Sequence, residues 1–198
     1  MARTQSKHYP EIRENILKAA AQLFANQGYA TTTIEDLSRA CTTSRGALYH
    51  YFESKEDILF HIIEGHVTAM YASLERALEG LEDPEERLRA IVRTVIAINV
   101  TTRAEQIVLL NETNQLKQAE QDSIREQQRR IVGILRRELI RIGSASTMTS
   151  DYEKVFTMMF LGMVNYTYVW FDPDGPVSPQ EYADLSVDVF LRGFLPKG

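Results

Sequence analysis

Apolar residues recur along most of the chain with the spacing of amphipathic helices. In the first segment Ile12, Ile16, Leu23 and Phe24 share one stripe, and Gly28 is placed to end the helix. No alternating run of polar and apolar residues has the length of a strand. The pattern predicts an all-α protein of about nine helices, over roughly residues 11–27, 34–41, 45–51, 55–80, 84–102, 104–116, 120–142, 150–171 and 179–194.

Polar turn and capping signals separate these helices. Asp83-Pro84 pairs an N-cap with a first helical proline, and the segment 172–176 contains two prolines and a glycine, which are typical of a turn. Another cap-and-acid pattern opens a helix at Lys55. The break before Lys55 predicts a three-helix domain over residues 1–54 and a larger helical bundle over residues 55–198.

Two short helices joined by a tight polar turn, with a longer helix before them, have the layout of a helix-turn-helix. Arg45 can contact guanine through two hydrogen bonds, and Tyr49, Tyr51 and Lys55 can donate to phosphates at its flank. Gly46 weakens a helix by about 1 kcal/mol relative to alanine, so its presence indicates close approach to another surface. The bare pattern also fits a small helical subdomain with a solvated polar face.

The N-terminal residues resemble the TetR family of bacterial repressors. The resemblance rests on Ile16-Leu17, Leu23-Phe24, Gly28-Tyr29, Thr32-Thr33-Ile34, the run Arg45–Phe52 and Lys55-Glu56. It implies a cytoplasmic all-α homodimer that binds a palindromic operator in double-stranded DNA. Thr42-Thr43 departs from the family, which usually has glycine followed by an aliphatic residue there. The family's DNA-binding positions correspond to Thr33, Thr43, Ser44, Arg45, Gly46, Tyr49, His50, Tyr51 and Lys55.

The predicted helix over residues 150–171 is apolar on nearly every side. A helix of this kind is buried, here between its own bundle and a second subunit. In TetR-like proteins the last two helices of each subunit usually form the dimer interface. The alternative is that this helix belongs only to the core of its own subunit. The expected interface consists of Phe156, Phe160, Tyr168, Tyr182, Leu185, Val189 and Phe190.

A ligand cavity within the bundle needs apolar, methionine-rich walls and a few polar groups. Asn99 and Asn111 are the most informative candidates, because a buried amide needs a hydrogen-bond partner. Ordinary core packing is the alternative for every candidate. The expected lining consists of Met70, Tyr71, Ile96, Asn99, Val100, Leu110, Asn111, Met159, Met163 and Tyr166.

A basic cluster follows on the predicted helix over residues 120–142. It fits a solvated face beside Glu126 and Glu138, or an anion site in which Arg125 and Arg129 bind a ligand phosphate. Its members are Arg125, Arg129, Arg130, Arg136 and Arg137.

A second resemblance bears on the ligand. Asn111-Glu112, the run Arg125–Arg129 and the run Trp170–Pro179 resemble the ligand domain of TetR-type regulators of fatty-acid, sterol or phenylacetate degradation. This resemblance implies an acyl-coenzyme A thioester as the small-molecule inducer. A hydrophobic drug-like inducer is the alternative.

Composition and missing motifs exclude other classes. The single Cys41 allows no intramolecular disulfide, and the apolar run Phe156–Val164 is too short to span a bilayer, so we expect no membrane partner. Neither HExxH nor a nucleophile elbow nor a phosphate-binding glycine motif occurs, so we expect no catalytic residue, metal or cofactor. A helical-bundle enzyme or metal-binding protein is the alternative. The net charge of −5 does not oppose DNA binding, because residues 1–50 hold six Lys and Arg against four Asp and Glu.

Overall fold

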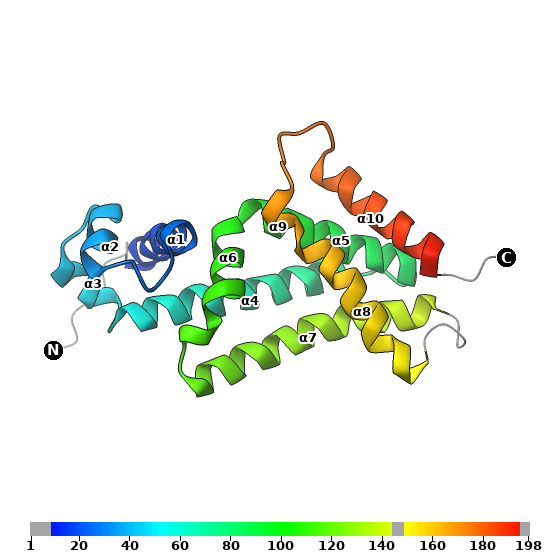
Figure 1. The fold of residues 1–198 in the computed structure, drawn as a ribbon, viewed down its shortest axis with the longest axis horizontal. Coiled ribbons are helices and arrows are strands. Elements are labelled where there is room, and N and C mark those ends of the chain that lie inside the picture. Colours follow the sequence, from blue (N-terminus) through cyan, green and yellow to red (C-terminus); the bar gives the residue numbers. More distant parts are fainter. Residues whose placement is uncertain (1–8, 144–148, 195–198) are drawn as a thin grey trace. The chain divides into compact units, whose positions relative to one another are not determined.

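The computed structural model describes residues 9–143 and 149–194. Within these ranges the chain forms α-helices, one 3-10 turn and no strand, in agreement with the predicted all-α class. The predicted helices are all present, but the one expected over residues 150–171 is broken at Tyr166. The helices, shown in Figure 1, are α1 (Tyr9–Gln27), α2 (Ile34–Ala40), α3 (Arg45–Tyr51), α4 (Lys55–Ala77), α5 (Pro84–Thr101), α6 (Arg103–Glu112), α7 (Gln118–Ile142), α8 (Ser150–Asn165), α9 (Thr167–Trp170) and α10 (Pro179–Phe194), with the 3-10 turn at Thr113–Gln115.

The chain forms two compact units. Unit 1 comprises residues 1–66 and 104–124, and unit 2 comprises residues 67–103 and 125–198. The division cuts α4 after His66 and α7 after Ile124, so both helices contribute to both units. The domain boundary expected between residues 54 and 55 stays a prediction. The two compact units follow a different division, in which most of α6 belongs with the N-terminal helices.

Unit 1 contains the three-helix layout expected from the sequence. The buried face of α1 carries Ile16 and Phe24 of the predicted apolar stripe, whereas Ile12 is 41% exposed. A capping box starts α2: Asp36 N donates to Thr33 Oγ1 at 3.1 Å, and Thr33 N donates to Asp36 Oδ2 at 3.0 Å. Leu37 of α2 and Leu48 of α3 are both buried, which fixes the inner faces of the two short helices.

The turn between α2 and α3 contains an unusual backbone conformation. Thr42 has a φ of 51°, which lies in the left-handed region. This conformation is disfavoured by about 1–2 kcal/mol for a residue with a Cβ, and glycine avoids most of that penalty. The position is therefore one where the fold favours glycine, and Thr42 adopts the conformation at a cost in stability.

Unit 2 is a bundle whose core lies between α4, α5, α7, α8 and α10. Helices α5 and α10 run side by side (Figure 1), and Arg93 of α5 donates two hydrogen bonds to Asp184 of α10 at 2.8 and 2.9 Å. One of the two interpretations of the basic cluster placed Glu138 beside a solvated face. Glu138 is instead buried and binds Arg87 at 2.9 Å and Arg141 at 2.7 Å. None of the described helices is long and apolar enough to cross a membrane.

Candidate functional site

The outer face of α3 is polar and open. Arg45, Tyr49 and His50 are exposed, while Leu48 on the opposite face is buried. Ser44 caps the helix, because its Oγ accepts from Ala47 N at 3.1 Å. The helix therefore presents a long cationic side chain and aromatic hydroxyl and imidazole groups to solvent, which are the donors that DNA reading requires.

Gly46 lies on this open face. A Cβ built at Gly46 would have only Ser44 Oγ nearby, at 4.0 Å, and the backbone φ is not positive. The fold itself therefore has no steric need for glycine at this position. The close approach of α3 to an external surface, which the sequence led us to expect at Gly46, stays a prediction.

Aromatic rings brace the end of α3. The ring of Tyr9, at the start of α1, lies 4.7 Å from the ring of Tyr51 and 5.9 Å from that of His50, measured between centroids. Tyr49, by contrast, is exposed. Sequence reasoning missed Tyr9, because its position at the end of a helix gives no periodic signal. The DNA contacts expected of His50 and Tyr51 stay predictions.

Two of the expected DNA-binding residues have other partners within unit 1. Thr33 directs its amide and its hydroxyl to Asp36, so a carboxylate already occupies the donors that a DNA contact would use. Lys55 Nζ donates to the carbonyls of Tyr29 and Thr32, both at 2.9 Å, and lies 4.2 Å from the centroid of the Tyr29 ring. The geometry supports capping for Thr33 and bracing of the loop before α2 for Lys55.

Thr43 closes the turn before α3. Its amide donates to the carbonyl of Ser38 at 2.9 Å, and its side chain is half-buried. The hydroxyl contact to DNA expected at this position stays a prediction.

Tyr29 links the loop after α1 to α4 and α6 of unit 1. Its hydroxyl donates to Glu56 of α4 at 3.0 Å, and its amide donates to Glu112 of α6 at 3.2 Å. Burial, together with the hydrogen bond to Glu56, raises the pKa of Tyr29 above its ordinary value. Glu112 thus positions the loop that leads into α2. Sequence reasoning gave Glu112 no role, since its partner lies 83 positions away.

A buried histidine also joins α4 to α6. His66 Nε2 lies 2.8 Å from Gln106 Oε1, and both side chains are buried. Burial lowers the pKa of His66 below its ordinary value, so the neutral imidazole is favoured in the folded chain. The contact between His66 and Gln106 therefore links α4 to α6 in the interior of unit 1.

The residues expected at a dimer interface differ in how far their side chains are exposed to solvent. Leu185 and Val189 of α10 are 55% and 57% exposed. Phe160 is fully buried and packs against Phe190, 4.5 Å away between ring centroids, so Phe160 belongs to the core of its own chain. The remaining expected residues are partly buried, namely Phe156, Tyr168, Tyr182 and Phe190.

Asn99 is the most informative of the expected ligand residues. It is buried, and its Nδ2 donates to Thr167 Oγ1 at 2.9 Å and to the carbonyl of Val164 at 3.4 Å. Among the described residues, no group donates to Asn99 Oδ1. A buried acceptor without a donor is uncommon, and a ligand hydroxyl or amide would satisfy it.

The other expected ligand residues do not gather around one cavity. Met159 and Tyr166 are 61% and 59% exposed, and Leu110 and Asn111 are exposed residues of unit 1. Ordinary packing accounts for the rest: Met70 and Ile96 are buried, Val100 and Met163 are partly buried, and Tyr71 stacks against Arg130.

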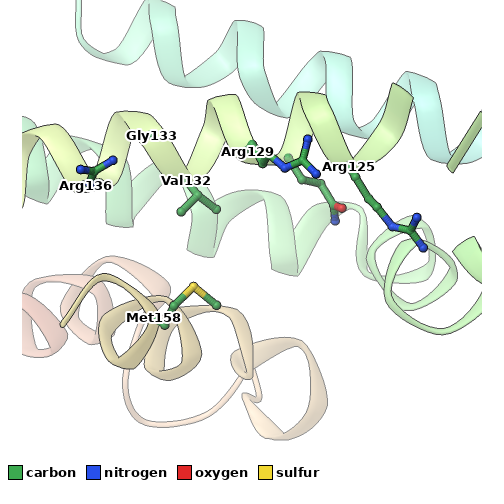
Figure 2. A pocket seen from close by; sticks show the side chains of 7 residues that line it. Arg125, Arg129, Val132, Gly133, Arg136 and Met158 are labelled. Carbon is green, nitrogen blue, oxygen red and sulfur yellow. The ribbon is translucent and has the colours of Figure 1, made fainter. Parts of the chain in front are cut away.

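A groove of about 560 Å³ lies between α7 and α8 in unit 2. Figure 2 shows arginine side chains spaced along α7, with Met158 of α8 facing them. Both arginines expected at an anion site line this groove. Sequence reasoning had not assigned several of the other residues here, although their spacing on α7 places them on one helix face. The lining consists of Arg125, Gln128, Arg129, Val132, Gly133, Arg136 and Met158.

A small apolar cavity of about 20 Å³ lies within the core of unit 2. It holds no more than a water-sized group, and its walls offer no polar side chain. Helix α7 contributes Ile131 and Leu135, and α8 contributes Leu161 and Val164.

Two family models cover most of the chain. The model for bacterial regulatory proteins of the tetR family matches residues 16–62. The model for the tetracyclin repressor-like C-terminal domain matches residues 81–194, more than half of the chain. The chain belongs to the TetR family. This TetR-family protein is a DNA-binding transcriptional regulator, and the helix-turn-helix expected from the sequence lies within the first match.

Individual relatives agree with this assignment. The crystal structure of a TetR-family regulator from Bordetella parapertussis 12822 is 35% identical, covers 91% of this chain and 94% of its own, and has a TM-score of 0.86. AibR, solved in complex with isovaleryl coenzyme A and operator DNA, is 27% identical over 90% of this chain and 97% of its own, with a TM-score of 0.79. The transcriptional repressor KstR2 of Mycobacterium tuberculosis is 22% identical over 94% of each chain.

Proposed function

We propose that this TetR-family protein is a cytoplasmic, non-enzymatic repressor that binds a palindromic operator as a homodimer through α3. The observation that carries the proposal is the open polar face of α3, with Arg45 exposed and Gly46 unneeded by the fold. Arg45 reads a guanine in the major groove, and Tyr49 contacts the flanking phosphates. The repressor KstR2 supports the direction of regulation.

The apolar surface of α8 and α10 supports the homodimer. Met159, Leu185 and Val189 are each more than half exposed, although water disfavours large apolar side chains. Gly162 and Gly193 have no atom within 4 Å of an added Cβ, so a second helix can approach closely there. A second copy of this chain buries this surface, and the two-fold pairing places two copies of α3 on successive major grooves.

Sedimentation of surface variants tests the homodimer. We expect wild-type protein to sediment as a dimer, and the double substitution Leu185→Glu and Val189→Glu to give monomers with weak operator binding. Ile140→Glu is the matched control, because Ile140 is an exposed apolar residue of α7. A double variant that remains dimeric, or a control variant that dissociates equally, would contradict the proposed interface.

The same proposal includes control of DNA binding by an acyl-coenzyme A thioester. AibR, which was solved with isovaleryl coenzyme A and operator DNA, supports this class of inducer. The arginine-lined groove in unit 2 suits phosphates, because a guanidinium binds phosphate oxygens through two parallel hydrogen bonds. The inducer must favour the conformation with low operator affinity, since a ligand that binds both conformations equally changes nothing.

A mobility-shift assay with the operator tests the inducer. We expect an acyl-coenzyme A to release the DNA, and the free fatty acid of the same chain to leave it bound. If thioesters of every tested chain length leave the complex intact, the proposed inducer class is wrong, whereas the DNA-binding function stands.

A further inference from the structure

The C-terminal end of α3 carries two side chains that the core of unit 1 does not fix. Helix α3 has only seven residues, of which Leu48 is buried, and Phe52 directly after it is 3% exposed. His50 is exposed and Tyr51 is only partly buried. Exposed side chains change rotamer within nanoseconds. His50 and Tyr51 therefore need a further contact if they are to keep one orientation in the free protein.

Tyr9, the first residue of α1, supplies that contact. Its ring centroid lies 4.7 Å from that of Tyr51, with the planes at 33°, and 5.9 Å from that of His50, with the planes at 88°. The rings of His50 and Tyr51 are themselves 5.3 Å apart, at 76°. All three separations lie in the range of about 4.5–7 Å that aromatic pairs favour. The three rings form a closed cluster, in which each ring contacts the other two.

Helix α1 is a firm support for this contact. Ile16 of α1 is buried in unit 1 at 3% exposure. The guanidinium carbon of Arg13, one turn after Tyr9, lies 4.9 Å from the centroid of the Phe52 ring. Tyr9 and Arg13 are four residues apart and so share one face of α1. The start of α1 thus contacts two consecutive residues, Tyr51 and Phe52, at the end of α3.

Restraint of these rings before binding affects affinity for DNA. An interface that must immobilise a free side chain loses roughly two- to twelvefold in affinity for each one. Tyr9 restrains the rings of His50 and Tyr51 in the free protein, so DNA binding does not have to order them. Without Tyr9 the two rings still contact each other. We therefore expect the loss to lie in the lower part of the range for two side chains, at roughly tenfold.

We propose that Tyr9 is a positioning residue for operator binding. Its ring holds His50 and Tyr51 in the orientation in which they face DNA, and Tyr9 does not itself contact the operator. This inference rests on the proposed binding of DNA through α3. It adds a residue of α1 to the determinants of that binding and gives His50 and Tyr51 a shared role, because one ring orients both.

Fluorescence anisotropy with the full-length protein tests the inference. The probe is a labelled duplex that carries the inverted repeat selected by wild-type protein from a random DNA library. We expect Tyr9→Ala to bind roughly tenfold more weakly and Tyr9→Phe, which keeps the ring and loses the hydroxyl, to bind like wild type. Ile12→Ala is the matched control, because Ile12 lies in the same turn of α1, is 41% exposed and should leave affinity unchanged.

A mutant cycle separates positioning from a general loss of stability. In protein that already carries His50→Ala and Tyr51→Ala, Tyr9→Ala should have almost no further effect on affinity, because the rings that it orients are absent. A loss of stability alone would weaken binding by the same factor in both backgrounds. Titration at protein concentrations far above the dissociation constant gives the active fraction, which should stay complete in Tyr9→Ala.

A second variant keeps the inference testable if Tyr9→Ala does not fold. Tyr9→Leu retains an apolar side chain at the start of α1 and removes the aromatic ring. The imidazole proton signals of His50 should move in this variant, because the ring current of Tyr9 is lost. Its operator affinity should fall by at least about threefold. Unmoved signals would show that the ring contact is not made in solution.

Three further results would overturn the inference. These are full affinity in Tyr9→Ala, a loss in Tyr9→Phe as large as that in Tyr9→Ala, and equal losses from Tyr9→Ala in the two backgrounds of the cycle. The proposed function fails in a different way, since wild-type protein would then select no shared DNA sequence. Weak binding by Arg45→Ala together with full affinity in Tyr9→Ala would refute the role of Tyr9 and leave operator binding through α3 standing.

Discussion

Replacing Gly46 with alanine separates the stability of α3 from its use at a DNA surface. The nearest atom to an added Cβ is Ser44 Oγ at 4.0 Å, an ordinary contact distance, so the methyl group creates no clash within the chain. Alanine favours a helix over glycine by about 0.5–1 kcal/mol, and we expect the free energy of unfolding to rise by that amount. If α3 approaches DNA closely at Gly46, the methyl group displaces the helix and weakens at least one hydrogen bond to the operator. We therefore expect roughly tenfold weaker operator binding, about 1.4 kcal/mol.

Chemical unfolding and fluorescence anisotropy with labelled operator measure the two effects. Gly65→Ala is the matched control, because Gly65 lies in the exposed part of α4 with no atom within 4 Å of an added Cβ. The control should gain similar stability and keep its operator affinity. Gly46→Ala with raised stability and unchanged affinity would refute the reasoning that glycine at this position serves DNA approach.

Three further predictions concern single side chains. Arg45→Ala should weaken specific operator binding by about 1–3 kcal/mol and relax the base preference at one position. Binding to a set of single-base operator variants measures both effects. Unchanged base selectivity would remove Arg45 from the base-reading residues. Thr42→Gly should raise the free energy of unfolding by about 1 kcal/mol in denaturant titrations, because glycine tolerates the φ of 51°. A loss of stability in this variant would contradict the assigned turn conformation. Because burial lowers the pKa of His66, its neutral form contributes full stability above the unfolded pKa of about 6.5, and this contribution is lost as the pH falls toward the lower folded pKa. His66→Gln should therefore reduce the decline in melting temperature between about pH 7 and 5, and an unchanged pH dependence would exclude His66 as its source.

Local signals predicted the helix-turn-helix well. Thr33 and Asp36 are three residues apart, so the capping box that starts α2 is visible in the sequence and present in the structure. In the structure α3 begins after its Ser44 cap and packs inward through Leu48. These features depend on neighbours within one helical turn.

Features that depend on distant residues were not predictable. The break at Tyr166 occurs where Thr167 accepts a hydrogen bond from Asn99, 68 positions away. Glu138 has a charge pattern that fits a solvated face, yet Arg87 pairs with it in the interior. Sequence periodicity shows that a helix has an apolar face and does not show which neighbour covers it.

The same limit applies to the candidate sites. Helix α8 is apolar on several sides, and sequence reasoning could not decide which side faces the core. Phe160 was expected at the interface and is in the core, while Met159 was expected at a ligand cavity and is exposed on the surface proposed for the dimer. The groove arginines were partly predictable, because Arg125 and Arg129 are four residues apart and share a helix face.

Selection of bound sequences from a random DNA library tests the central claim most directly. For wild-type protein the account predicts enrichment of an inverted repeat whose half-sites are centred about one helical turn apart, or a multiple of one turn. Arg45→Ala should enrich the same repeat with relaxed preference at one position in each half-site. Recovery of no shared sequence by the wild-type protein, or of a single unpaired half-site, would contradict a homodimeric regulator that reads its operator through α3.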